Sequence, residues 1–249
     1  MALQHDSGGF PGLVIANRYK LNYLFAQTFQ TEVWEASDLN LGREVTLKLI
    51  HNGDIPIGAG RLNTTGVLKI FDITNHQGSA VVVSEKIQSQ SLEQLIENKE
   101  HLSPLEVQTI LIAVTKIIEK THLQGVPHLS LTPSNVLISN DGEIYLTDFR
   151  GQLEKKGPFD PEEDLKSLRS LLAELLKLCP RLSVPDYLWR LANNQSFYSP
   201  KSVLEFRIIL EKELVPAKNK KKQRHLPIVF CLLFVGIVFL STWIFVGGF

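Results

Sequence analysis

Cysteine is scarce in this chain, and its scarcity excludes a fold held together by disulfides. Among 249 residues the only cysteines are Cys179, near the end of a helical pattern, and Cys231, inside an apolar run. We therefore expect no disulfide framework, and a reducing compartment around the globular part. No C-x-x-C or H-E-x-x-H motif occurs, so the spacing of potential ligands predicts no metal site.

An excess of charge of either sign is also lacking, since 26 basic residues balance 26 acidic ones. A general nucleic-acid binder needs surplus Lys and Arg against the phosphates, so we predict no nucleic-acid partner. Met1 to Pro11 lack a basic start followed by an apolar run and do not indicate a signal peptide. Hydrophobic residues make up 44% of the chain, which is enough for a packed core.

Charged residues are absent from Leu226 to Phe249. A helix from Ile228 to Val246 would be about 28 Å long, close to the hydrocarbon thickness of a bilayer. Four lysines and an arginine precede this run within residues 216–225, and basic residues beside a membrane span favour the cytoplasmic side. We predict a single-pass C-terminal anchor with the N-terminal domain cytoplasmic; a buried core helix is the alternative. The basic residues either only set the topology or also attract anionic lipid headgroups.

Strand patterns fill most of the first half of the chain, and helical patterns most of the second. Glycines and a proline within residues 52–66 disfavour a long helix there. The expected strands cover Tyr19–Phe25, Glu32–Ser37, Arg43–Ile50, Val67–Ile73, Ser79–Ile87, Val136–Ile138 and Glu143–Thr147, the last two flanking an Asn-Asp-Gly turn. The expected helices cover Ser91–Glu97, Ser103–His122, Pro161–Leu178 and Ser199–Leu214.

Four segments carry a resemblance to protein kinases. Residues 122–137, HLQGVPHLSLTPSNVL, are similar in spacing to the kinase catalytic-loop pattern H-x-x-G-I-x-H-R-D-L-K-P-x-N-I-L. Residues 145–150, YLTDFR, resemble the strand leading into D-F-G, and residues 42–48, GREVTLK, resemble the strand that bears the V-A-I-K lysine. Residues 164–176 resemble the helix that starts D-x-x-S-L-G. The residues of these motifs most resemble those of bacterial serine/threonine kinases.

The resemblance implies an α+β fold: an abridged two-lobe protein-kinase-like domain with a β-rich N-lobe and a helical C-lobe, followed by one C-terminal transmembrane helix. The expected organisation is an N-terminal extension at 1–17, the N-lobe at 18–87, the C-lobe at 88–215, a basic juxtamembrane linker at 216–225 and the membrane anchor at 226–249.

The catalytic-loop segment departs from the kinase pattern at the positions that carry the chemistry. Ser130 stands at the position of the catalytic aspartate, which in kinases accepts the proton of the substrate hydroxyl. Serine is uncharged near neutral pH and is a poor base. Thr132 stands at the lysine that contacts the transferred phosphoryl group, and Leu129 at the arginine. His128 matches the histidine of the loop, which the resemblance makes a packing residue.

Further departures affect phosphate and peptide binding. Ala26, Thr28 and Thr31 stand at the glycines of the phosphate loop, and Arg150 at the D-F-G glycine. Side chains at these positions keep backbone amides farther from phosphates. Residues 52–65 contain no glutamate to pair with the lysine, and the segment after D-F-G is too short for an activation loop with a peptide-docking surface.

Three residues match kinase positions that contact phosphates and hold magnesium: Lys48, Asn135 and Asp148. They indicate either residual nucleotide binding or retention for structural reasons. From the departures we predict a pseudokinase that is not an enzyme, with no catalytic residue, cofactor or metal. It would act as a scaffold or regulatory binding module at the membrane, for a protein partner that the sequence does not identify. The alternatives are a nucleotide sensor with weak Mg-ATP binding and a weakly active serine/threonine kinase.

Overall fold

The computed structural model describes residues 8–51, 55, 60, 62–150, 161–195 and 199–212. The chain divides into two compact units, residues 1–214 and 215–249. The predicted linker at 216–225 and the predicted membrane anchor at 226–249 lie outside the described residues. Within the described ranges, no helix is both long enough and apolar enough to cross a membrane.

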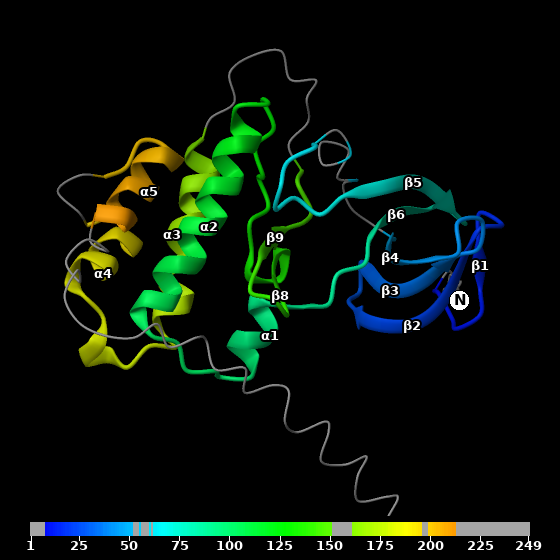
Figure 1. The fold of residues 1–249 in the computed structure, drawn as a ribbon, viewed down its shortest axis with the longest axis horizontal. Helices are drawn as coiled ribbons and strands as arrows, with labels where there is room; N and C mark the ends of the chain where they lie inside the picture. Colours follow the sequence, from blue (N-terminus) through cyan, green and yellow to red (C-terminus); the bar gives the residue numbers. More distant parts are fainter. Residues whose placement is uncertain are drawn as a thin grey trace, which may run out of the picture. The chain divides into compact units, whose positions relative to one another are not determined.

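The first half of the described chain forms one antiparallel sheet of six strands (Figure 1). Its strands are β1 (Val14–Ile15), β2 (Tyr19–Gln27), β3 (Thr31–Asp38), β4 (Arg43–Ile50), β5 (Ile70–His76) and β6 (Ser79–Glu85), in the spatial order β1-β2-β3-β4-β6-β5. Alternate residues of β3 are buried, as the period of two requires. Trp34 and Ala36 of that strand join Leu47, Leu49 and Val83 in a core on one face of the sheet.

Two features of this sheet differ from the prediction. Strand β1 lies in the predicted N-terminal extension, because a strand of two residues is too short to show a period. Strand β5 begins at Ile70 rather than at Val67, because the residues before it pair elsewhere. Val67 forms a parallel bridge with Leu146, and the Leu68 amide donates to the Leu146 carbonyl at 2.9 Å.

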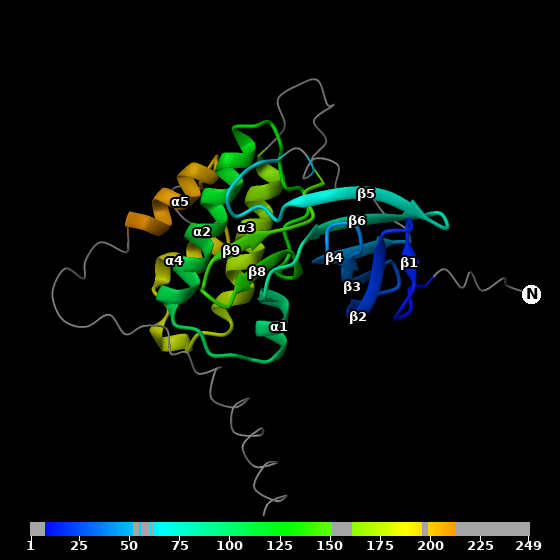
Figure 2. The same cartoon turned by 45° about the vertical axis from the view of Figure 1, so that its right-hand side comes forward.

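The second half contains a small sheet and the helices (Figures 1 and 2). Strand β7 (Ser89–Ser91) pairs with β8 (Val136–Ser139), and β8 pairs with β9 (Ile144–Leu146). The helices are α1 (Leu92–Glu97), α2 (Pro104–His122), α3 (Glu162–Leu176), α4 (Asp186–Ala192) and α5 (Val203–Lys212), with short 3₁₀ turns at Pro133–Asn135 and Arg181–Ser183. Helix α4 was not predicted; it has only seven residues, and it is buried at Leu188 and Leu191.

The starts of α1 and α2 follow from local chemistry. Each begins with a capping box: Ser91 caps α1 with Gln94 as its reciprocal partner, and Ser103 caps α2 with Glu106. Each box satisfies orphan backbone amides at the start of its helix. Pro104 then occupies the first turn of α2, where its missing N–H has no cost. These signals are local, which is why the sequence places both starts within a residue of the structure.

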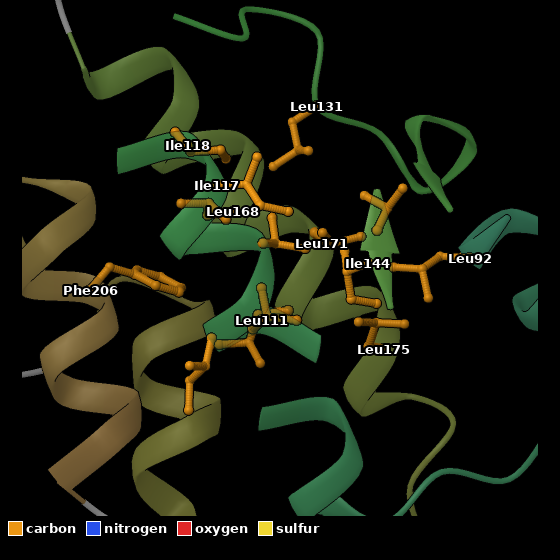
Figure 3. Close-up of a cluster of buried hydrophobic side chains, with 14 of the residues drawn as sticks. Leu92, Leu111, Ile117, Ile118, Leu131, Ile144, Leu168, Leu171, Leu175 and Phe206 are labelled. Carbon is orange, nitrogen blue, oxygen red and sulfur yellow. The ribbon is translucent and has the colours of Figure 1, made fainter. Parts of the chain in front are cut away.

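Helices α2, α3 and α5 pack around a common apolar core, which also receives the small sheet. Figure 3 shows Leu111 and Ile117 of α2, Leu168 and Leu171 of α3, and Phe206 of α5 directed into it. Full burial of a leucine side chain contributes about 2 kcal/mol. This core fixes the small sheet, and with it the strand end that leads to Asp148.

The two sheets are joined at Gly66. The Leu146 amide of β9 donates to the Gly66 carbonyl at 2.7 Å. Gly66 has φ +88°, and a Cβ there would lie 2.6 Å from Ile117 Cδ1 of α2. A side chain is therefore excluded by backbone conformation and by space together. The contact ties the segment that leads into the six-stranded sheet to the core of the helical part.

Candidate functional site

Two of the three predicted site residues meet although 100 positions separate them. Lys48 lies on β4, opposite Val33 of β3 and Val82 of β6, and its Nζ donates to Oδ2 of Asp148 in a short ion pair. The two side chains are 25% and 16% exposed. A pair that is mostly withdrawn from water is screened less than a surface pair. Lys48 is thus not the solvated strand-edge lysine that a purely structural interpretation implies.

Asp148 is held in place by the residues on either side of it. Its backbone has φ +62°, in the left-handed region that non-glycine residues seldom occupy. Phe149 is fully buried, and its ring lies 4.3 Å from the His128 ring between centroids. The Arg150 amide donates to the His128 carbonyl at 2.9 Å. Packing on one side and a hydrogen bond on the other therefore maintain a strained conformation, as is typical of functional sites.

Asn135 is hydrogen-bonded to Ser130, the residue at the position of the catalytic aspartate. Its Nδ2 donates to the Ser130 carbonyl at 2.6 Å and lies 3.5 Å from Ser130 Oγ. The Asn135 carbonyl accepts from the Thr147 amide at 3.1 Å, which ties the loop to the strand end before Asp148. The asparagine is buried, and among the described residues no hydrogen bond reaches its Oδ1. That oxygen can accept a hydrogen bond from a ligand or coordinate a metal ion.

Asp164, at the start of α3, anchors the loop that carries Ser130. Its carboxylate accepts from the amides of His128 at 2.9 Å and Leu129 at 2.8 Å, and Oδ2 lies 2.7 Å from His122 Nε2. Burial disfavours the charged form, but the bonds from His122 and from the two amides outweigh it, and the pKa of Asp164 is lowered. The sequence pattern places Asp164 at the start of a kinase-like helix but does not indicate this role, because its partners lie 35 to 42 residues away in sequence.

His128 is a buried, neutral packing residue. Burial lowers its pKa to about 4, against the opposing effect of Asp164. Its Nδ1 accepts from the Ser130 amide at 3.3 Å, which leaves the ring proton on Nε2. The neutral ring packs against Phe149 at an interplanar angle of 37°, so it fills space in the loop without adding a charge.

The turn that replaces the glycine loop is closed by its own side chain. Oγ1 of Thr28 accepts from the amides of Gln30 at 3.2 Å and Thr31 at 3.0 Å. Those amides are therefore engaged within the turn, while a phosphate-binding loop presents its amides to the ligand. Thr28 therefore disfavours phosphate binding in two ways: its side chain adds bulk, and it occupies the amide donors of Gln30 and Thr31. The second effect was not evident from the sequence.

The oxygen atoms near Lys48 fit a magnesium ion that is completed by phosphates. Magnesium in nucleotide sites is bound by one or two carboxylates together with phosphate oxygens and waters. Asp148 supplies a carboxylate and Asn135 an amide oxygen. Among the described residues there is no cluster of three or more His, Cys, Asp or Glu side chains suited to a metal.

The sequence of this chain is similar to the sequences of known protein kinases. The family described as Protein kinase domain matches residues 59–156. The chain is 28% identical over 155 residues to the probable serine/threonine-protein kinase PknB of Corynebacterium glutamicum, covering 55% of this chain and 24% of that protein. It is 27% identical over 155 residues to the serine/threonine-protein kinase PknA of Mycobacterium tuberculosis, covering 55% and 36%. The chain thus spans about a quarter to a third of the length of these two relatives.

Solved structures give the same fold. The crystal structure of the Mycobacterium tuberculosis PknI kinase domain matches with a TM-score of 0.66 and 17% identity, covering 83% of this chain and all of that one. The apo form of PpkA-294 matches with a TM-score of 0.65 and 14% identity, covering 82% and 99%. The predicted two-lobe kinase-like arrangement, a β-rich lobe followed by a helical one, is confirmed.

These similarities contradict the prediction that the chain is not an enzyme. The matching family is that of protein kinase domains, and the curated relatives are named as serine/threonine kinases. The prediction rested on the joint loss of the base at Ser130, the lysine at Thr132, the glycine loop and the peptide-docking surface. In physical terms general-base catalysis is worth about 10²–10⁴-fold, so its loss slows phosphoryl transfer without abolishing it.

Proposed function

Because the sequence and the fold of this chain are similar to those of protein kinases, we propose that it binds Mg-ATP and transfers a phosphoryl group slowly to a protein hydroxyl. The observation that carries the proposal is the meeting of Lys48 with Asp148 beside Asn135. These are the residue types that neutralise phosphates and hold magnesium in kinases. The kinase names of the relatives support the reaction class, and the target protein is not specified by them.

Each retained residue has a role that follows from its position. Lys48 can reach phosphate oxygens from β4 because its long stem is flexible. Asp148 and Asn135 would hold a magnesium ion, which would supply positive charge to neutralise the charge that develops on the transferred phosphoryl group. Ser130 stands where a base would, and its hydroxyl can hydrogen-bond an attacking hydroxyl without taking its proton. The transition state of phosphoryl transfer is loose, so positioning and charge supply most of the catalysis.

The proposal predicts nucleotide-dependent stabilisation of the full chain in mild detergent. A ligand at a hundred times its Kd adds about 2.7 kcal/mol to the stability of the folded state, which raises the melting temperature by several degrees. We expect such a rise with millimolar Mg-ATP, and its loss in Lys48→Ala and Asp148→Ala. Lys166→Ala is the matched control, since that lysine is 63% exposed on α3. Transfer of labelled phosphate from ATP, reduced in the same two variants, tests the reaction itself.

No thermal shift at any ATP concentration would contradict the binding part of this proposal. A shift without labelled phosphate transfer, tested with the chain itself and with a general protein acceptor, would contradict the enzymatic part. The two measurements therefore separate nucleotide binding from chemistry.

We further propose that residues 226–249 attach the domain to a membrane, with the basic linker on the same side as the domain. The absence of charge over these residues and the basic residues before them support this. The full chain should float with lipid vesicles and resist extraction at high salt and high pH, and a chain lacking residues 226–249 should not. Recovery of the full chain in the aqueous fraction would contradict the proposal.

A further inference from the structure

Lys48 and a divalent cation require the same carboxylate. The Lys48 ammonium forms an ion pair with Oδ2 of Asp148. Asp148 is also the carboxylate that would bind magnesium in this site. Among the described residues, Asp148 is the carboxylate within ion-pair distance of Lys48. Residues 52–65, which follow the lysine strand, contain Asp54 as their sole acidic residue and no glutamate. The lysine therefore uses the metal ligand as its counter-ion.

The two partners differ in how far they can move. Asp148 is fixed, because its left-handed backbone lies between the packed Phe149 ring and the strand end of β9. Lys48 is anchored only at its backbone, by the register of β4 with β3 and β6. Its four-carbon stem can swing the ammonium away. When a divalent cation approaches Asp148, the lysine is the group that leaves.

Like charges and limited solvent make joint occupancy unfavourable. An ammonium on Oδ2 and a divalent cation on the same carboxylate repel at short range, and their partial burial reduces screening. Removal of the ammonium should therefore strengthen the binding of a cation to Asp148.

We propose that Lys48 competes with the divalent cation for Asp148, and that this competition couples cation binding to nucleotide binding. The cation displaces Lys48 from Asp148, and the released ammonium then binds the phosphates of the nucleotide. A bound cation frees the Lys48 ammonium for the phosphates, and bound ATP holds that ammonium away from Asp148. The cation and ATP therefore raise each other's affinity. The coupling rests on the proposed function, whereas the competition is a property of the protein without nucleotide.

The test measures Mn²⁺ binding to the full chain in detergent without nucleotide, from the electron paramagnetic resonance signal of the free ion. Lys48→Met keeps an unbranched side chain that is one atom shorter and removes its charge. We expect this variant to bind Mn²⁺ at least tenfold more tightly than the unmodified chain. The gain should vanish in Lys48→Met combined with Asp148→Asn, which places it at Asp148. Lys166→Met, which removes an exposed lysine near Glu163, should leave the affinity unchanged.

Equal or weaker Mn²⁺ binding by Lys48→Met would overturn the competition, provided that circular dichroism shows a folded variant. Lys48→Gln gives the same test if the methionine variant is unstable. For the coupling, Mn²⁺ should raise ATP affinity at least tenfold in the unmodified chain, and ATP should raise Mn²⁺ affinity equally. Lys48→Met should weaken ATP binding and reduce this mutual effect; an unchanged effect would overturn the coupling. Absence of ATP binding by the unmodified chain would contradict the proposed function and the coupling that rests on it, while the nucleotide-free comparison would still decide the competition.

Discussion

Replacement of Ser130 by aspartate should raise the rate of phosphoryl transfer by about a hundredfold, the lower end of what a general base contributes. The substitution places a carboxylate in the loop between His128 and Asn135. Asn135 Nδ2, now 3.5 Å from Ser130 Oγ, could donate a hydrogen bond to that carboxylate. The loop itself needs no rebuilding, because Asp164 already holds the amides of His128 and Leu129.

The measurement is labelled phosphate transfer from ATP at saturating Mg²⁺, with the chain and a general protein acceptor as substrates. Ser134→Asp is the matched control, because it adds the same charge to an exposed hydroxyl of the same loop. Ser130→Asn is a second control that supplies similar size without a base. If Ser134→Asp raised the rate as much as Ser130→Asp, the effect would come from charge rather than from a base. An unchanged rate in Ser130→Asp would show that the acceptor does not approach residue 130.

The second large effect is expected at Asp164, where asparagine should lower the free energy of unfolding by about 3 kcal/mol. The carboxylate accepts two backbone amides and contacts His122, and its side chain is fully buried. An asparagine can accept through only one oxygen, so one of these donors would face an NH₂ group. For a chain of this size the loss corresponds to a fall in melting temperature of about 6–12 °C.

The pH dependence gives the Asp164 prediction a second readout. Because the pKa of Asp164 is lowered in the folded protein, its stabilisation is present above the ordinary aspartate pKa of about 3.9 and is lost as pH falls through the lowered value. The difference between the unmodified chain and Asp164→Asn should therefore be full at neutral pH and shrink in acid. Asp186→Asn is the control, since that aspartate is 73% exposed in a surface pair with Arg190. Surface pairs contribute at most about 1 kcal/mol.

A melting temperature of Asp164→Asn within two degrees of the control would show that the three contacts of Asp164 do not stabilise the loop. A difference from the unmodified chain that stayed constant into acid would show that the charge of Asp164 does not contribute. Thermal unfolding of both variants over a range of pH decides between these results.

Local signals determined much of the fold from sequence. The turn after Asp38 and the alternation that follows it predicted β4 at Arg43–Ile50, and the structure has the same bounds. Ser103 and Pro104 predicted the start of α2 because a helix cap needs only the next three residues. The resemblance of three segments to kinase motifs singled out Lys48, Asn135 and Asp148 as candidate site residues.

Only the tertiary structure decided how those residues interact. The sequence could not show that Lys48 bonds Asp148, since a lysine can pair with any carboxylate that the fold brings near it. It also could not show that Asp164 holds the amides of His128 and Leu129. Short-range patterns determine elements because backbone hydrogen bonds and caps are local, whereas the partner of a charge depends on packing between segments 35 to 100 residues apart.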